Sequence, residues 1–168
     1  MPSPQTIEGM VAFAADLEDV DSVALRKGLE IARLHRQVER AVETSLAGWG
    51  LTARQIEILE SLYHNSAGVM TPADLSDEVG LTRSAMTSAL DGLEKHGHTA
   101  RGPHPTDRRM VVISLTPSGR AFIGGHLPDR YRKVSGIMEA LSARERAVLL
   151  KTYRKVLDFL AADARESS

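Results

Sequence analysis

The side chains best suited to bind a polyanion gather on one predicted helix that begins at Thr82. Its outward face combines one cation with short hydroxyl side chains, which reach base edges or phosphates without a clash. An arginine in that position pairs with guanine or with phosphate. The residues of this face are Thr82, Arg83, Ser84, Thr87 and Ser88, with Asp91 further along the helix. An ordinary solvated helix surface has the same composition, so this helix alone leaves both interpretations open.

A second group of charges lies in a turn-rich loop over residues 102–109. The loop ends in Asp107, Arg108 and Arg109, and Arg101 directly precedes it. Arginines at a loop tip suit a narrow minor groove, where the negative potential of DNA is enhanced. We expect Asp107 to orient an arginine through a charge-assisted hydrogen bond. A solvated charge cluster in a hairpin turn is the alternative interpretation, and the helices that precede the loop make it the less favoured one.

Three short helices are predicted to lead up to this loop. Thr52 and Gln55 have the spacing of a capping box at the start of the first helix. The second helix begins at Thr71–Pro72, with proline at its first position. Gly80 ends the second helix and Thr82 caps the third.

Strands are predicted on both sides of the basic loop, at residues 99–101 and 110–115, because the second run is β-branched and half apolar. Together they make a β-hairpin with the loop at its tip. The predicted order is two helices, a short turn, a third helix and a hairpin. This is the order of a winged helix-turn-helix, in which the third helix enters the major groove. The sequence therefore predicts a mainly α protein of the α+β class, with a central DNA-binding lobe.

Longer helices flank this lobe. From Val23 to Ala47 the apolar positions recur at steps of three and four residues, which predicts one long amphipathic helix. After Thr116 another helix begins, and the residues Gly124–Pro128 predict a kink or break in it. Ser142 with Glu145 predicts a capping box for a final helix. Met10–Leu17 has the pattern of a short helix in an acidic leader.

The charge of the chain is unevenly distributed. The net charge of the 168 residues is −1, but residues 1–25 carry five acids and no base, whereas residues 82–109 carry five cations against three acids, a net of +2. A local basic face, rather than the overall charge, is what DNA binding requires. No run approaches the roughly 18 apolar residues of a membrane span, and the first residues lack a secretory pattern. We therefore expect a soluble, cytoplasmic protein without a membrane partner.

The sequence resembles the MarR family (multiple antibiotic resistance regulators) over about residues 23–160. Two blocks carry most of this resemblance by their order and spacing, Leu90–Gly97 and Asp107–Arg109 followed by Leu115–Gly119. Gly50–Thr52, with Gln55 and Leu59 after it, and Leu75–Ser84 add to it. His98 and Thr99 depart from the family, whose members usually carry aliphatic residues there. His98 is either a satisfied core histidine or a titratable group near DNA.

The resemblance implies a homodimer of two winged helix-turn-helix lobes joined by N- and C-terminal dimerisation helices. By the same resemblance, the helix from Thr82 reads the major groove of double-stranded DNA and Arg109 enters the minor groove. The implied activity is that of a ligand-responsive transcriptional repressor on a pseudo-palindromic operator. A nonspecific, architectural DNA-binding protein and a winged-helix module that binds another protein are the alternatives. The predicted parts are the leader (1–22), an N-terminal dimerisation helix (23–50), the DNA-binding lobe (51–116) and C-terminal dimerisation helices (117–168).

Members of this family commonly hold phenolic or other aromatic acids between the lobe and the dimerisation helices, so the resemblance implies a small aromatic or phenolic effector. Five residues near that junction are candidates to line the pocket: His35, Arg36, Trp49, Arg54 and His64. Each also has a structural interpretation. In that interpretation, Trp49 is a packing residue between two turn glycines, and the charged residues face solvent or the dimer partner.

Neither catalysis nor a cofactor is predicted. The chain has no cysteine, which excludes thiolate catalysis, thiolate metal sites and disulfides. Its six histidines include no His-x-x-x-His pair on a helix, so the sequence predicts no metal site. No glycine-rich phosphate loop is present either.

Overall fold

The structure, a computed structural model, describes residues 3–104, 106 and 110–166. The predicted tip residues Asp107, Arg108 and Arg109 lie outside the described residues. The chain forms two compact units, residues 1–58 and residues 59–168. Helices make up most of both units, and the described strands form one small antiparallel sheet in the second unit.

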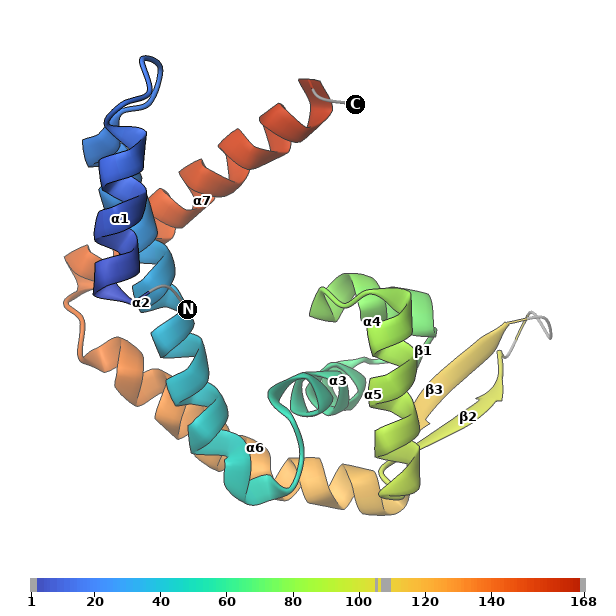
Figure 1. Ribbon diagram of the computed structural model, residues 1–168. Coiled ribbons are helices and arrows are strands. Elements are labelled where there is room, and N and C mark those ends of the chain that lie inside the picture. Colours follow the sequence, from blue (N-terminus) through green and yellow to red (C-terminus); the bar gives the residue numbers. More distant parts are fainter. Residues whose placement is uncertain (1–2, 105, 107–109, 167–168) are drawn as a thin grey trace. The chain divides into compact units, whose positions relative to one another are not determined.

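The first unit consists of helices. Its elements are α1 (Pro4–Ala14), α2 (Ser22–Leu46), the 3-10 turn η1 (Ala47–Trp49) and the start of α3 (Ala53–His64) (Figure 1). The leader helix begins six residues earlier than predicted, because the Ser3 side chain accepts a hydrogen bond from the Thr6 amide at 3.1 Å and Pro4 follows it. The long helix was predicted to within one residue at each end.

The second unit has the winged helix-turn-helix order. After the rest of α3 come β1 (Val69–Met70), α4 (Pro72–Val79), α5 (Arg83–Lys95), β2 (Thr99–Pro103), β3 (Val111–Leu115), α6 (Pro117–Glu139) and α7 (Ala143–Glu166). The sheet order is β1-β3-β2, and β2 pairs with β3 from Thr99↔Leu115 to Pro103↔Val111. Figure 1 shows this hairpin extending away from α4 and α5. The prediction missed β1, because two residues are too few to show a strand period.

The core of the second unit is built from the predicted apolar stripes. Leu62 on α3, Leu75 on α4 and Leu93 on α5 are completely buried, as is Ile123 on α6. Burying each such side chain contributes about 1.5–3 kcal/mol. The first half of α6 therefore belongs to the same core as the three short helices and is not a separate element.

Of the kink or break predicted for α6, the break is wrong. The helix runs without interruption through Gly124, Gly125 and Pro128. A proline removes one backbone hydrogen bond and crowds the carbonyl four residues earlier, which here belongs to Gly124. Ile123 and Leu127 are buried on either side of this point, and their packing offsets the lost bond. None of the helices in the described part of the chain combines the length and the apolarity that a membrane span requires.

The end of α5 and the start of α6 are joined at one close backbone contact. Gly97 turns the chain after α5 with a φ of 72°. The Thr116 hydroxyl donates to the Gly97 carbonyl at 2.6 Å, and the Ser118 hydroxyl donates to the same oxygen at 2.8 Å. Gly119 lies against the His98 peptide so closely that a Cβ on it would stand 2.7 Å from the His98 carbonyl carbon and nearer still to its oxygen. We call these residues, together with the His98 peptide, the α5–α6 junction.

Replacing Gly119 with alanine should lower the free energy of unfolding by about 2–4 kcal/mol, because the new methyl group meets backbone atoms that cannot rotate away. Chemical denaturation measures this directly. Gly125→Ala is the matched control, since it lies on the same helix with open space at its Cβ position. That variant should gain up to about 1 kcal/mol from helix propensity. Equal effects of the two substitutions would show that the close contact does not constrain the fold.

Candidate nucleic-acid interface

The turn between α4 and α5 is fixed at both helix ends. Thr71 and Asp74 form a reciprocal capping box at the start of α4, with the Asp74 amide donating to Thr71 Oγ1 at 3.1 Å. Hydrogen bonds from the Thr71 hydroxyl and amide lower the pKa of Asp74, which therefore stays ionised as the cap requires. Gly80 ends α4 in the left-handed conformation, with a φ of 69°. Thr82 then caps α5 by accepting a hydrogen bond from the Ala85 amide at 3.3 Å.

These caps leave one face of α5 outside the core. Met86, Leu90 and Leu93 are buried on the inner side of the helix. Every residue predicted for the outer face is exposed: Thr82, Arg83, Ser84, Thr87, Ser88 and Asp91. The Thr87 hydroxyl donates to the Arg83 carbonyl at 3.0 Å, which keeps this short side chain close to the helix. The outer face of α5 is therefore polar and carries short side chains, apart from the arginine in the first turn of the helix.

Arg101 has partners that the sequence did not reveal. Its guanidinium on β2 reaches back to the last turns of α5 and pairs with Asp91 and Glu94, both at 2.5 Å. The hydrogen bond to Asp91 and the two nearby carboxylates raise the pKa of Arg101. This bridge attaches the first strand of the hairpin to α5, and it places a cation among the only acids of that helix.

A hollow of about 400 Å³ lies between the start of α4, the outer face of α5 and the second strand of the hairpin. Its lining includes Pro72, Met110 and Val111, together with Arg83 and Thr87 from the predicted DNA-binding face. Two of the predicted contact residues therefore border a concave surface.

His98 lies at the α5–α6 junction within a series of rings. Its ring stacks on Phe122 of α6 at 4.4 Å and parallel to His96 at 6.2 Å. Phe122 in turn contacts His126 at 4.4 Å. The Nδ1 atom of His98 is buried and has no hydrogen-bond partner among the described residues. His98 is therefore a packed histidine, and burial followed by the charge of His96 lowers its pKa.

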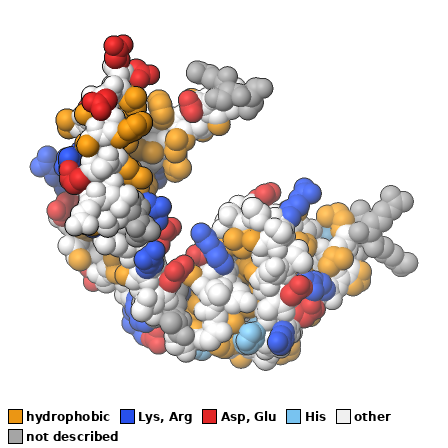
Figure 2. Space-filling view, in the orientation of Figure 1, with side chains coloured by type: hydrophobic (Ala, Val, Ile, Leu, Met, Phe, Trp, Pro, Cys, Tyr) orange, Lys and Arg blue, Asp and Glu red, His pale blue; other side chains and the backbone are white. Residues whose placement is uncertain are grey.

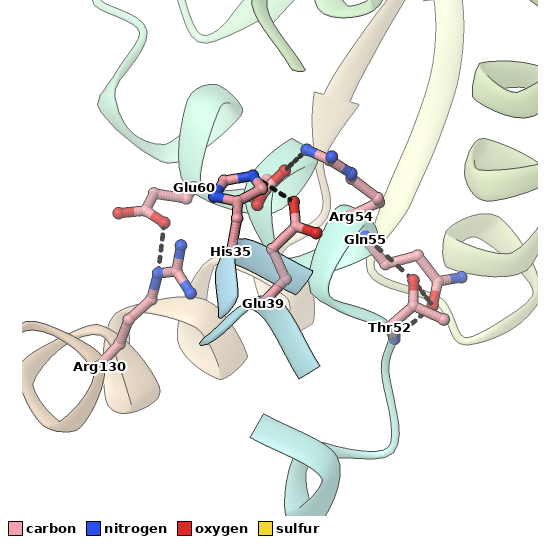
Figure 3. Close-up of polar contacts among 8 residues, drawn as sticks. His35, Glu39, Thr52, Arg54, Gln55, Glu60 and Arg130 are labelled. Carbon is pink, nitrogen blue, oxygen red and sulfur yellow. Dashed lines mark hydrogen bonds and ion pairs between the residues drawn. The ribbon is translucent and has the colours of Figure 1, made fainter. Parts of the chain in front are cut away.

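A polar cluster connects α3 with the middle of α6. Arg130 Nε donates to Glu60 at 2.8 Å, and both side chains are largely buried (Figure 3). Beside them, His64 Nε2 and the Tyr131 hydroxyl share a hydrogen bond of 2.7 Å. Partial burial and the Glu60 carboxylate raise the pKa of Tyr131 to about 12, so its hydroxyl keeps its proton. His64, a predicted pocket residue, thus contributes to a contact between helices.

A groove of about 350 Å³ in the first unit holds two of the other predicted pocket residues, His35 and Arg54. Both are paired with acids, His35 Nε2 with Glu39 at 3.4 Å and Arg54 with Glu57 at 2.8 Å (Figure 3). The rest of the lining is Val38, Val42, Glu43 and Ala53. Arg36 and Trp49 are not part of this lining. Among the described residues, no group of three metal-binding side chains occurs.

Two helices joined by a tight turn, an exposed arginine-and-hydroxyl face and an antiparallel hairpin define a winged helix-turn-helix protein of the DNA-binding type. A model of the MarR family matches residues 49–110. The HTH-type transcriptional repressor YetL of Bacillus subtilis is 29% identical over 133 residues, which cover 79% of this chain and 80% of YetL. The HTH-type transcriptional regulator YwhA of the same organism is 35% identical over 99 residues, covering 59% of this chain and 70% of YwhA.

Among solved structures, that of a MarR variant from E. coli complexed with operator DNA superimposes with a TM-score of 0.69 at 28% identity. The superposition covers 83% of this chain and 99% of that one. The chain belongs to the MarR family and is a DNA-binding transcriptional regulator. The family, the fold and the class of function were therefore predicted correctly from the sequence.

The lowered pKa of His98 has a consequence for stability. Because the folded protein holds this ring neutral, the unfolded chain takes up the proton first as the pH falls below the ordinary value of 6.5. The free energy of unfolding should therefore decrease from about pH 6.5 downward until His98 itself is protonated in the fold. His98→Phe keeps the stack on Phe122 but cannot take up a proton. In this variant, the contribution of residue 98 to the loss of stability at low pH should vanish. Denaturation at about pH 8 and about pH 5 measures it, and an identical pH slope in both proteins would contradict the assignment.

Proposed function

We propose that this regulator is a homodimeric repressor that reads a pseudo-palindromic operator with α5 and the hairpin. The observation that carries the proposal is the outer face of α5, where a single arginine stands among side chains too short to keep the helix out of the major groove. Arg83, Ser84, Thr87 and Ser88 would contact bases and phosphates, with Thr82 at the helix start. Arg108 and Arg109 at the hairpin tip would enter the minor groove.

A second copy of the chain is the proposed partner of the long helices. Large apolar side chains on the second half of α6 and on α7 are exposed, among them Ile137 at 47% and Leu157 at 62%. In the first unit, α2 exposes Ile31 at 62% and Leu34 at 54%. So much exposed apolar surface is unusual for a monomer and typical of a dimer interface. In this proposal residues 51–116 bind DNA, while residues 23–50 and 117–168 hold the dimer together.

Footprinting on the chain's own genomic DNA should reveal discrete protected sites with two-fold symmetry and half-sites about 34 Å apart, one helical turn. Arg83→Ala should weaken binding to such a site by about 1–3 kcal/mol, roughly 5- to 150-fold, because a base or phosphate contact is lost. Arg109→Ala should also reduce the slope of log affinity against log salt by about one. Fluorescence anisotropy with the protected sequence measures both effects.

Arg165→Ala is the charge-matched control, since it removes an exposed cation near the end of α7. It should bind as the wild type does. Uniform protection of all DNA would indicate an architectural protein instead. If Arg83→Ala and Arg109→Ala both bind DNA as tightly as the wild type does, the winged helix is not the DNA-binding surface and is better explained as a site that binds protein.

We further propose that the groove between α2 and α3 binds a small phenolic effector. The groove presents three carboxylates, Glu39, Glu43 and Glu57, against the single guanidinium of Arg54. An aromatic carboxylate would be repelled by this excess of negative charge, whereas a neutral phenol donates its O–H to a carboxylate. Its ring would lie on Val38 and Val42. The volume of about 350 Å³ is sufficient for one ring.

Phenol should therefore release operator DNA at lower concentration than benzoate does. Val42→Trp fills the groove and should abolish the response to phenol while leaving DNA binding in place. Val23→Trp, at an exposed position on the same helix and outside the groove lining, is the control. Stronger release by benzoate, or an unaltered response in Val42→Trp, would show that the groove is not the effector site.

A further inference from the structure

The N-terminal segment, residues 4–21, is an integral part of the first unit. Ile7, Val11 and Ala14 of α1 are buried, and α1 packs against α2. Arg26 of α2 forms a two-pronged ion pair with Glu8, one prong at 2.7 Å. Asp21 then caps α2 by accepting hydrogen bonds from the Val23 and Ala24 amides. The segment therefore presents a fixed outer surface.

That outer surface is apolar and acidic together. Met10 and Phe13 lie three residues apart on the exposed side of α1, with exposed fractions of 45% and 72%, and Leu17 follows at 42%. The carboxylates of Asp16, Glu18 and Asp19 are exposed beside them and have no ion pair among the described residues. Figure 2 shows acidic side chains around the turn between α1 and α2, next to hydrophobic ones. Such a surface suits a partner that is apolar and cationic.

Helix α7 has two apolar surfaces on different sides. Its broad face, on the steps of three and four from Leu149 to Leu160, is the one assigned above to the dimer. A separate stripe contains Val148, Lys151, Lys155 and Phe159, spaced at i, i+3, i+7 and i+11 and therefore on one side of the helix. Val148 and Phe159 are 56% and 69% exposed. Within the described part of the chain neither lysine has an ion-pair partner.

The two surfaces match in chemistry. Val148 to Phe159 spans about 16 Å along the helix, at 1.5 Å per residue, which is about three helical turns. Phe13 is followed within six residues by Asp16, Glu18 and Asp19, whereas Phe159 shares its side of α7 with Lys151 and Lys155. Asp158 lies beside these two lysines, so the stripe is basic by one net charge. The stripe also adjoins the broad face of α7, so a second copy seated on that face is the molecule closest to it.

We propose that the N-terminal segment of one protomer docks on the Val148–Phe159 stripe of α7 in the second copy. Phe13 packs beside Phe159, and the acidic turn faces Lys151 and Lys155. This inference rests on the proposed dimer and adds a second interface to it. The leader is then part of the assembly, rather than an appendage outside the common core.

Engineered disulfides test the contact, since the chain has no cysteine of its own. Phe13→Cys protein mixed with Phe159→Cys protein should give a disulfide-linked dimer on mild oxidation, seen on a non-reducing gel. Leu149→Cys, on the broad face of α7, is the control and should link to Phe13→Cys much less. Equal linking at both positions, or none at Phe159→Cys, would overturn the proposal. So would an intramolecular disulfide in the Phe13→Cys/Phe159→Cys double variant.

Charge reversal provides an independent measurement. Glu18→Lys/Asp19→Lys should weaken the dimer about tenfold at low salt by sedimentation equilibrium, and Lys151→Glu/Lys155→Glu should do the same. Mixed at equal amounts, the two reversed proteins should form heterodimers about as tight as the wild-type dimer, because both contacts then pair opposite charges. Arg165→Glu, which changes a cation of α7 beyond the stripe, is the control. Mixed with Glu18→Lys/Asp19→Lys, it leaves one of the two contacts repulsive, so that heterodimer should stay weaker. If the wild type is a dimer and neither charge reversal weakens it, only this inference is overturned. If the wild type is a monomer, the proposed dimer is overturned as well.

Discussion

The contact of Gly119 with the His98 peptide is the constraint on which the rest of the second unit depends. It joins the last turn of α5, the helix predicted to face DNA, to the first turn of α6, which leads to the exposed apolar helices. The hydroxyls of Thr116 and Ser118 donate to the Gly97 carbonyl, and the Thr116 amide donates to the His98 carbonyl at 3.0 Å. The start of α6 is therefore held against the end of α5 by both backbone and side-chain hydrogen bonds. The close contact of Gly119 with the His98 peptide involves backbone atoms that side-chain rotation cannot move apart.

Further along α6, a second attachment has a different character. Glu60 with Arg130 and His64 with Tyr131 connect α3 to α6 through side chains, at separations of 70 and 67 residues in the sequence. Paired charges that are partly buried are costly to separate, because each would be left without its partner. The helix is thus fixed to the lobe at its start and near its middle, and only its second half is exposed on all sides. That division within one helix is what allows α6 to serve both the lobe and the proposed dimer.

Local signals in the sequence were sufficient for most of the fold. Capping boxes at Thr52 and Ser142, and the glycine after α4, are governed by residues within one turn, so they were predicted correctly. The continuity of α6 was not, because the packing of Ile123 and Leu127 that offsets Pro128 comes from distant segments. Arg101 was predicted to contact DNA, and its ion pairs were missed for the same reason, since Asp91 and Glu94 become its neighbours only when β2 folds against α5. The Leu115–Gly119 pattern was recognised, but the Gly97 and His98 carbonyls that its residues contact lie 18 to 21 residues earlier in the chain.

The bridge from Arg101 to Asp91 and Glu94 also bears on how such a regulator finds its site in a genome. Nonspecific attraction to DNA grows with every cation that can release a counterion from the phosphates, and it competes with the true site across the whole chromosome. A guanidinium already neutralised by two carboxylates adds little to that background. Its acids in turn do not repel the duplex as free carboxylates would. We therefore expect the bridge to lower the nonspecific attraction to DNA, while Arg83 on the outer face of α5 has no ion pair among the described residues.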